Sequence, residues 1–301
     1  MIENELNKRI TILLICFGLV MCTSPKVCEI PILFDSQNGI FQINADGSKR
    51  TQITNTKNSS KPALSPLGDK IAYISNIDDT AALCLIDLNG SNRHQLTFSQ
   101  DFASIYGRPA WSPSGKEIAY NSRQNDNWDI YVFNLEDLTN RRLTFNEELD
   151  EFPSWSPDGN LILFSSRRNG NYDLFTMNSK TGEDIRQITF SESDEFRATY
   201  SPDGHRIAYS SNETGDWNIY IMDLNGASIT QLTNCKKSCL RPSWSPCGNK
   251  IVFQSGSDGQ LENWSDWEIF IFDLKSRKVL KITNNNFMDA HPDWCSFYIS
   301  K

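Results

Sequence analysis

Six residues that could bind an anion or a peptide recur at one position along the chain, each directly before a short segment that usually begins with proline. Four are basic and one is a histidine, and the set is Lys61, Arg108, Phe152, Arg197, Arg241 and His291. Two places before each stands a second set with three acidic members, namely Ser59, Tyr106, Asp150, Glu195, Cys239 and Asp289. Arginine binds a carboxylate at two points, so a basic ring suits a peptide terminus or an acidic sugar. The alternative is structural, with each arginine paired to an acidic residue of its own or an adjacent unit.

The other reactive residue types give little support for catalysis or for a metal site. Many serines lie within Ser-Pro-x-Gly, which is a turn sequence, and there is no Gly-x-Ser-x-Gly nucleophile motif. The three histidines, His94, His205 and His291, form no cluster in the sequence, and no Asp-x-Asp-x-Asp-Gly loop is present. We therefore predict no catalytic residue, no metal site and no cofactor.

The charge of the chain argues against a nucleic-acid partner. Its formal net charge is −8 over 301 residues. An acidic surface repels phosphate backbones, whereas proteins that bind nucleic acid carry basic patches.

The residues around the basic set belong to a repeat of about 45 residues, the period of a propeller blade. Its turn begins at Ser65, Ser112, Ser156, Ser201 and Ser245, which gives steps of 47, 44, 45 and 44. Each copy ends in a Leu-Thr or Ile-Thr pair, and the pairs are Ile53-Thr54, Leu96-Thr97, Leu143-Thr144, Ile188-Thr189, Leu232-Thr233 and Ile282-Thr283. Six endings predict six units.

Within one unit the pattern indicates four short strands. A tryptophan-bearing strand precedes Ser-Pro-x-Gly, in which proline presets φ and glycine closes the turn. An alternating strand such as 118–120, a third strand such as 128–133 and the Leu/Ile-Thr strand follow. We predict an all-β fold, a six-bladed β-propeller of four-stranded blades. Six equivalent residues before the innermost strands should then ring a central channel. We predict no cofactor; the alternative is a calcium ion in this channel, held by carbonyl and carboxylate oxygens.

The two ends of the chain should complete one blade together. Residues 32–36 align with the second strand of the other units, and residues 291–295 align with the first. The C-terminus should therefore supply the innermost strand of a blade whose other strands come from the N-terminus. This clasp would leave no open sheet edge at the closure.

The cysteines suggest two disulfides. Cys28 and Cys295 align two places apart within one turn, so we expect them to bond and hold the ring closed. Cys235 and Cys239 share a short loop and form the second candidate pair. Cys84 lies in an apolar strand and is expected to be buried.

The first 22 residues are expected to be a signal peptide or a lipoprotein leader. Lys8 and Arg9 precede an apolar run of twelve residues, 10–21, which is short for a membrane span of about 17–25 residues. The sequence ending at Cys22 resembles a lipoprotein processing site, which makes Cys22 the candidate for lipidation. Cleavage after Ser24 and an uncleaved anchor are the alternatives. The chain is expected to be exported, either periplasmic or a membrane-anchored lipoprotein.

The repeated Pro-x-Trp-Ser-Pro-Asp-Gly, Ile-Ala-Tyr-x-Ser, Asp-Ile-Tyr-Val and Gln-Leu-Thr segments resemble the TolB-type propeller repeat over residues 28–301. The N-terminal α/β domain of TolB is missing from the resemblance. The resemblance implies a non-catalytic, monomeric scaffold that binds a protein or peptide partner at the cell envelope. Related propellers also form oligogalacturonate lyase, so binding or lyase-type cleavage of an acidic oligosaccharide in the channel is the alternative.

The tryptophans divide into those that follow the repeat and one that departs from it. The repeating ones are expected to be core between blades, and they are Trp111, Trp155, Trp244, Trp128, Trp217 and Trp267. Trp264 lies outside the repeat, in a longer loop at 257–265. An aromatic residue on a loop insertion is a candidate for contact with a partner or a glycan.

Overall fold

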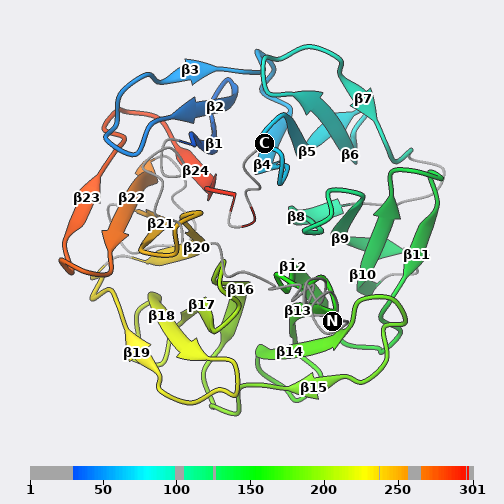
Figure 1. Ribbon diagram of the computed structural model, residues 1–301, viewed down its shortest axis with the longest axis vertical. Helices are drawn as coiled ribbons and strands as arrows, with labels where there is room; N and C mark the ends of the chain where they lie inside the picture. Colours follow the sequence, from blue (N-terminus) through cyan, green and yellow to red (C-terminus); the bar gives the residue numbers. More distant parts are fainter. Residues whose placement is uncertain are drawn as a thin grey trace, which may run out of the picture.

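The computed structural model describes residues 30–98, 105–124, 127–236, 238–256, 266–295 and 297, and all their regular elements are β-strands. Six four-stranded antiparallel sheets stand as blades around one axis (Figure 1). The innermost strands are β4 (Ser59–Leu64), β8 (Ile105–Trp111), β12 (Asp150–Trp155), β16 (Glu195–Tyr200), β20 (Cys239–Trp244) and β24 (Asp289–Asp293). The predicted six-bladed propeller is confirmed.

The remaining strands of each blade follow outward in one order. The second strands are β5 (Lys70–Ile77), β9 (Glu117–Gln124), β13 (Leu161–Ser166), β17 (Arg206–Ser211), β21 (Lys250–Ser255) and β1 (Ile32–Ser36). The third are β6 (Thr80–Asp87), β10 (Asn127–Asn134), β14 (Asp173–Asn178), β18 (Asn218–Asp223), β22 (Glu268–Asp273) and β2 (Gly39–Ile43). The outer ones are β7 (His94–Gln95), β11 (Asn140–Arg142), β15 (Arg186–Gln187), β19 (Thr230–Gln231), β23 (Val279–Lys281) and β3 (Thr51–Gln52).

The ring is closed by a blade built from both ends of the described chain. Strand β24 pairs antiparallel with β1, with Leu33 opposite Asp293 and Ser36 opposite Asp289. The order β24-β1-β2-β3 makes the C-terminal strand the innermost one. The predicted clasp is confirmed.

The recurring serines are structural members of the turns between the first and second strands. In five blades the serine Oγ accepts the N–H of the residue five places on, at 2.9–3.1 Å. The turn glycines adopt positive φ, for example +73° at Gly159, which favours glycine. Each serine hydroxyl is therefore used to close its own turn.

The Leu/Ile-Thr pair that ends each unit is a hydrogen-bonding latch for the outer part of the blade. In all six blades the threonine Oγ1 accepts a backbone N–H from the third strand at 2.8–3.0 Å. The Oγ1 of Thr144, which is buried, accepts from Ile130 and donates to Asp129. The repeat retains threonine because the side chain satisfies a buried donor that the short outer strand does not reach.

Replacing Thr144 with valine should lower the free energy of unfolding by about 1–3 kcal/mol, since the buried N–H of Ile130 loses its acceptor. Thr144→Ser keeps the hydroxyl and should lose much less. Urea unfolding of both variants measures the difference, and equal stability of the valine and serine variants would show that the latch contributes nothing.

Four tryptophans form hydrogen bonds through their indole N–H groups, three of them to the neighbouring blade and that of Trp294 within the closing blade. The bonds run from Trp111 to the carbonyl of Ala63, from Trp155 to Ala110, from Trp244 to Thr199 and from Trp294 to Ile30, at 3.0–3.2 Å. All four rings are buried, as is Trp267. The inter-blade role predicted for Trp111, Trp155 and Trp244 is confirmed.

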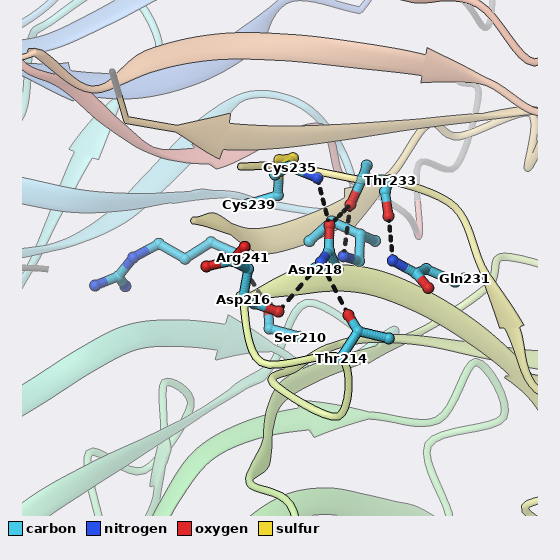
Figure 2. The surroundings of a disulfide bond; sticks show 10 residues. Ser210, Thr214, Asp216, Asn218, Gln231, Thr233, Cys235, Cys239 and Arg241 are labelled. Carbon is cyan, nitrogen blue, oxygen red and sulfur yellow. Dashed lines mark hydrogen bonds between the residues drawn. A yellow bond between two sulfur atoms is a disulfide. The ribbon is translucent and has the colours of Figure 1, made fainter. Parts of the chain in front are cut away.

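One predicted disulfide is present and one is not. Cys235 and Cys239 are bonded, next to Asn218, whose Oδ1 accepts the Cys235 N–H at 2.8 Å (Figure 2). Cys295 is a free, buried thiol whose Sγ lies 3.3 Å from the Ser65 carbonyl oxygen. The predicted Cys28–Cys295 bond is therefore wrong, because the Cys295 side chain is packed into the apolar core that also holds Cys84. Cys28 and Cys22 lie outside the described residues.

Candidate functional site

A β-bulge near the start of each innermost strand positions the site. The register shifts in all six first-to-second strand pairs, and in five of them a non-glycine residue with φ of 53–61° stands at the shift. These residues are Lys61, Phe152, Arg197, Arg241 and His291. Non-glycine residues with positive φ are uncommon, and bulges commonly re-aim a side chain. Five of the six residues predicted to ring the channel thus share one strained backbone geometry.

Four of the six bulges are held by a hydrogen bond to the blade before them. The backbone N–H groups of Arg197 and Arg241 donate to Ser165 and Ser210, both at 3.2 Å. In the same way, His291 donates to Gln254 at 2.8 Å, and Lys61 donates to Asp35 at 3.1 Å. Because these acceptors lie on neighbouring second strands, the site depends on the assembled ring.

Strand β8 departs from the sequence alignment. It contains one additional residue, so Gly107 takes the positive φ (86°) and Arg108 follows it. Ile105 pairs with Ser122 as Asp150 pairs with Ser166, which makes Ile105, not Tyr106, the equivalent of Asp150. The placement of Tyr106 in the second set was wrong, because the additional residue shifts the register.

Four of the five basic candidates line one small central pocket of about 60 Å³, formed with Phe152 and several prolines. They are Arg108, Arg197, Arg241 and His291. Arg108 is ion-paired with Asp293 at 2.7 Å and also donates to the Pro292 carbonyl. Nδ1 of His291 lies 2.8 Å from Asp35. The structure therefore brings the basic residues together as predicted.

Two of the other three basic residues contact aromatic rings. The Arg197 guanidinium lies 4.6 Å from the centroid of Phe152 and 4.7 Å from that of Phe196. Lys61 Nζ lies 4.4 Å from the centroid of Tyr106. Cation–π contacts of this kind stabilise a charge that is partly removed from water.

Burial controls the ionisation of these groups. It lowers the pKa of His291 to about 3, with a further contribution from Arg241, so this imidazole is neutral near pH 7. Burial, followed by repulsion from Arg241, lowers the pKa of Lys61 to about 8. The pKa of Arg241 lies well below its usual value, first through burial and then through repulsion from Arg197. The pocket is thus crowded with positive charge.

The acidic candidates lie apart from this pocket, buried at the starts of innermost strands. Asp150 is paired with Arg168 at 2.9 Å, and Asp289 with Arg50 at 3.0 Å. Glu195 is bonded by Ser191 and Ser211 and has no ion pair among the described residues. Arg108 is paired, but with an acid of a blade that is not adjacent to its own, and Asp150 and Asp289 pair with other arginines, so the structural alternative does not hold for the ring as a whole.

A continuous aromatic arc borders the pocket, and the sequence repeat did not reveal it. Successive ring centroids along the arc are 4.5–6.0 Å apart. Its members in order are Trp128, Tyr106, Phe152, Phe196 and Trp217. Trp128 and Trp217 are only partly buried, so they belong to this arc and are not blade core as predicted.

Four phenylalanines form an exposed rim on the same face as the bulges. We call Phe98, Phe145, Phe190 and Phe287 the rim phenylalanines; they are 48–77% exposed. Each lies between the outer strand of one blade and the innermost strand of the next. All innermost strands begin on one face, because every blade repeats the same order, so the rim phenylalanines lie on the face of the bulges at four of the six connections between blades. Exposed apolar side chains that gather on one face contribute to an interaction surface.

Three other expectations concern features away from the pocket. Trp264 lies outside the described residues, as does the leader. No group of three or more His, Cys, Asp or Glu side chains within the described ranges could hold a metal ion. The part of the chain that the structure describes also has no helix long and apolar enough to cross a membrane.

Comparison with known proteins places the repeat in a family. The family model for the TolB beta propeller domain matches residues 33–209 and 199–296. The chain belongs to that family. No curated protein matches its sequence.

Solved structures share the fold at low sequence identity. TolB from Acinetobacter baumannii is 24% identical with a TM-score of 0.76, over 88% of this chain and 66% of that TolB. A nidogen/laminin complex matches at 11% identity and a TM-score of 0.71, over 88% of this chain and 98% of the other. An oligogalacturonate lyase in complex with manganese matches at 15% identity and a TM-score of 0.61, over 85% of this chain and 74% of the lyase. At these identities the likeness concerns the fold, and this TolB-type propeller spans slightly less than two thirds of the A. baumannii protein.

Proposed function

We propose that this TolB-type propeller is an exported, non-catalytic scaffold that binds a protein or peptide partner at the cell envelope. The partner would dock on the face that carries the bulges, with its centre over the pocket and its edge on the rim phenylalanines. The observation that carries the proposal is the exposure of all four rim phenylalanines on this one face.

The chemistry of the face supports binding of a protein surface. Aromatic and arginine side chains are the residues most often found at the energetic centres of protein interfaces. Here the arc and the basic pocket supply both types at the centre, and the rim supplies apolar area around them. Phe145, at 71% exposure, has the Arg142 guanidinium 4.7 Å from its ring centroid. A partner with apolar side chains at its edge and an acidic group at its centre would match this pattern.

The size of the pocket favours this reading over cleavage or deep binding of an acidic oligosaccharide. Its volume of about 60 Å³ is well below the ~300–1,000 Å³ of ordinary ligand pockets. Entry of a sugar ring among Arg108, Phe152 and Arg241 would require the residues that line the pocket to move. A peptide side chain or terminus needs less room.

Replacing three rim residues together, Phe98, Phe145 and Phe190, with serine should weaken partner binding by at least about 30-fold, the loss of one hot-spot residue. The partner is first captured from envelope extract with the full chain, then purified, and its affinity is measured by calorimetry. The matched control replaces three exposed leucines of the opposite face, Leu67, Leu138 and Leu224, with serine. Unchanged affinity of the rim variant, or an equal loss in the control, would refute docking on this face.

A further inference from the structure

Arg241 is a buried cation whose backbone is fixed but whose guanidinium forms no ion pair within the described part of the chain. The residue is 8% exposed and stands at the bulge of β20 with a φ of 61°. Its N–H is bound by Ser210, and its side chain points away from the Cys235–Cys239 disulfide (Figure 2). Nε of Arg241 has no hydrogen-bond partner, and no carboxylate of the described residues forms an ion pair with it. A charge buried in this way is costly unless something pairs with it.

The carboxylates nearest the pocket are already engaged. Asp293 accepts from Arg108 at 2.7 Å and from the Leu64 N–H at 2.8 Å. Asp35 lies 2.8 Å from His291 and accepts the Lys61 N–H. Asp293 is thus paired with Arg108, and Asp35 attracts Arg241 without forming an ion pair with it, while Arg197 and Arg108 both repel it. The pocket holds an excess of positive charge that an additional anion would balance.

We propose that this pocket binds one carboxylate group, with Arg241 as its principal ligand and Arg197 as a second source of positive charge. A guanidinium presents paired N–H donors that match the two oxygens of a carboxylate. The pocket, at about 60 Å³, suits a group of that size. This carboxylate site deepens the proposed function, because a partner's acidic side chain or C-terminus could supply the group. A free small acid offers the same chemistry, and the experiment separates the two sources.

The test uses the full chain with sodium acetate as the probe and sodium chloride at equal ionic strength as the reference. Acetate should raise the melting temperature of the wild type progressively, since a ligand that binds only the folded state stabilises it by mass action. Arg241→Met should abolish this response and, without acetate, should melt no lower than the wild type, because it removes an uncompensated charge. Arg186→Met, at an exposed arginine outside the pocket, should respond as the wild type does.

A second variant keeps the test decisive if Arg241→Met does not fold. Arg241→Lys retains the charge but lacks the two-point donor geometry, so it should bind acetate at least about tenfold more weakly, measured by calorimetry. An equal effect of chloride and acetate, or an unchanged acetate response in the folded Arg241 variant, would overturn the carboxylate site.

Competition between acetate and the partner identifies the source of the carboxylate. If saturating acetate lowers the affinity of the purified partner, the partner supplies the carboxylate. If acetate binds through Arg241 and partner affinity does not change, the ligand is a free small acid. If partner binding depends on the rim but acetate does not bind at all, the carboxylate site is refuted and the proposed function stands.

Discussion

Replacing Trp244 with alanine is expected to lower the free energy of unfolding by about 3–5 kcal/mol, the cost of deleting a buried aromatic side chain. Its indole is fully buried in the core between the blade of β16–β19 and the blade of β20–β23, where Ile251 and Phe253 also lie. Nε1 donates to the Thr199 carbonyl at 3.2 Å, and the Arg206 guanidinium lies 4.7 Å from the ring centroid. The variant therefore loses packing, a hydrogen bond and a cation–π contact at a single blade junction.

Two further variants separate these contributions. Trp244→Phe keeps most of the packing but leaves the Thr199 carbonyl without its donor, so its loss should be clearly smaller than that of alanine. Phe190→Ala removes a ring that is 77% exposed and should change stability by no more than about 0.5 kcal/mol. The free energy of unfolding of Trp244→Ala, Trp244→Phe and Phe190→Ala is measured by guanidinium denaturation, with circular dichroism as a signal that does not depend on tryptophan. Equal losses for Trp244→Ala and Phe190→Ala would show that this junction does not stabilise the ring.

The architecture could be predicted from the sequence because each blade contains the same short motifs, whose hydrogen bonds lie within that blade. Ser-Pro-x-Gly closes a turn with its own serine, and the Leu/Ile-Thr pair binds the third strand of its own blade. Such contacts span 5 to 15 residues and recur with the repeat, so counting the motifs counts the blades. The clasp followed from the same counting, since both ends of the chain stop within a unit.

The details of the site depend on contacts between blades and on departures from the repeat, which one sequence does not reveal. The additional residue in β8 moves Tyr106 out of the acidic set and into the aromatic arc. Asp150 pairs with Arg168 and Asp289 pairs with Arg50, and neither arginine lies in an innermost strand. The sequence could gather the cations in one ring, but it could not show that Arg108 is paired with Asp293 whereas Arg197 and Arg241 form no ion pair with a carboxylate of the described residues.

Of the three acidic candidates, Glu195 is the one that forms no ion pair with a described residue. Glu195 is 3% exposed and occupies the place that Asp150 occupies in the preceding blade. Where that blade has Arg168, this blade has Glu213, and the N–H of each donates to the serine two places before it. Burial accordingly raises the pKa of Glu195 to about 7, opposed by a hydrogen bond from Ser191. A carboxyl group that should be ionised in the unfolded chain is thus held partly protonated in the folded one.

Stability should therefore fall as the pH rises from about 4.5 to 7 and level off above that. The folded state binds this proton more tightly than the unfolded state, so the contribution is complete at low pH and is lost as the pH passes the folded pKa of about 7. A shift of this size corresponds to about 3 kcal/mol in total. Glu195→Gln resembles the protonated acid at every pH. It should match the wild type near pH 5 and exceed it in melting temperature at pH 8.

Two variants of the same structural position test the cause. Asp150→Asn breaks the 2.9 Å pair with Arg168, so it should be less stable than the wild type at pH 8, opposite in sign to Glu195→Gln. Glu213→Arg should place a guanidinium beside Glu195 as Arg168 stands beside Asp150, which would lower the pKa of Glu195 and remove the loss of stability between about pH 4.5 and 7. If the gain from Glu195→Gln is the same at pH 5 and pH 8, or if Glu213→Arg leaves the pH dependence intact, ionisation of Glu195 is not what sets the stability of this blade.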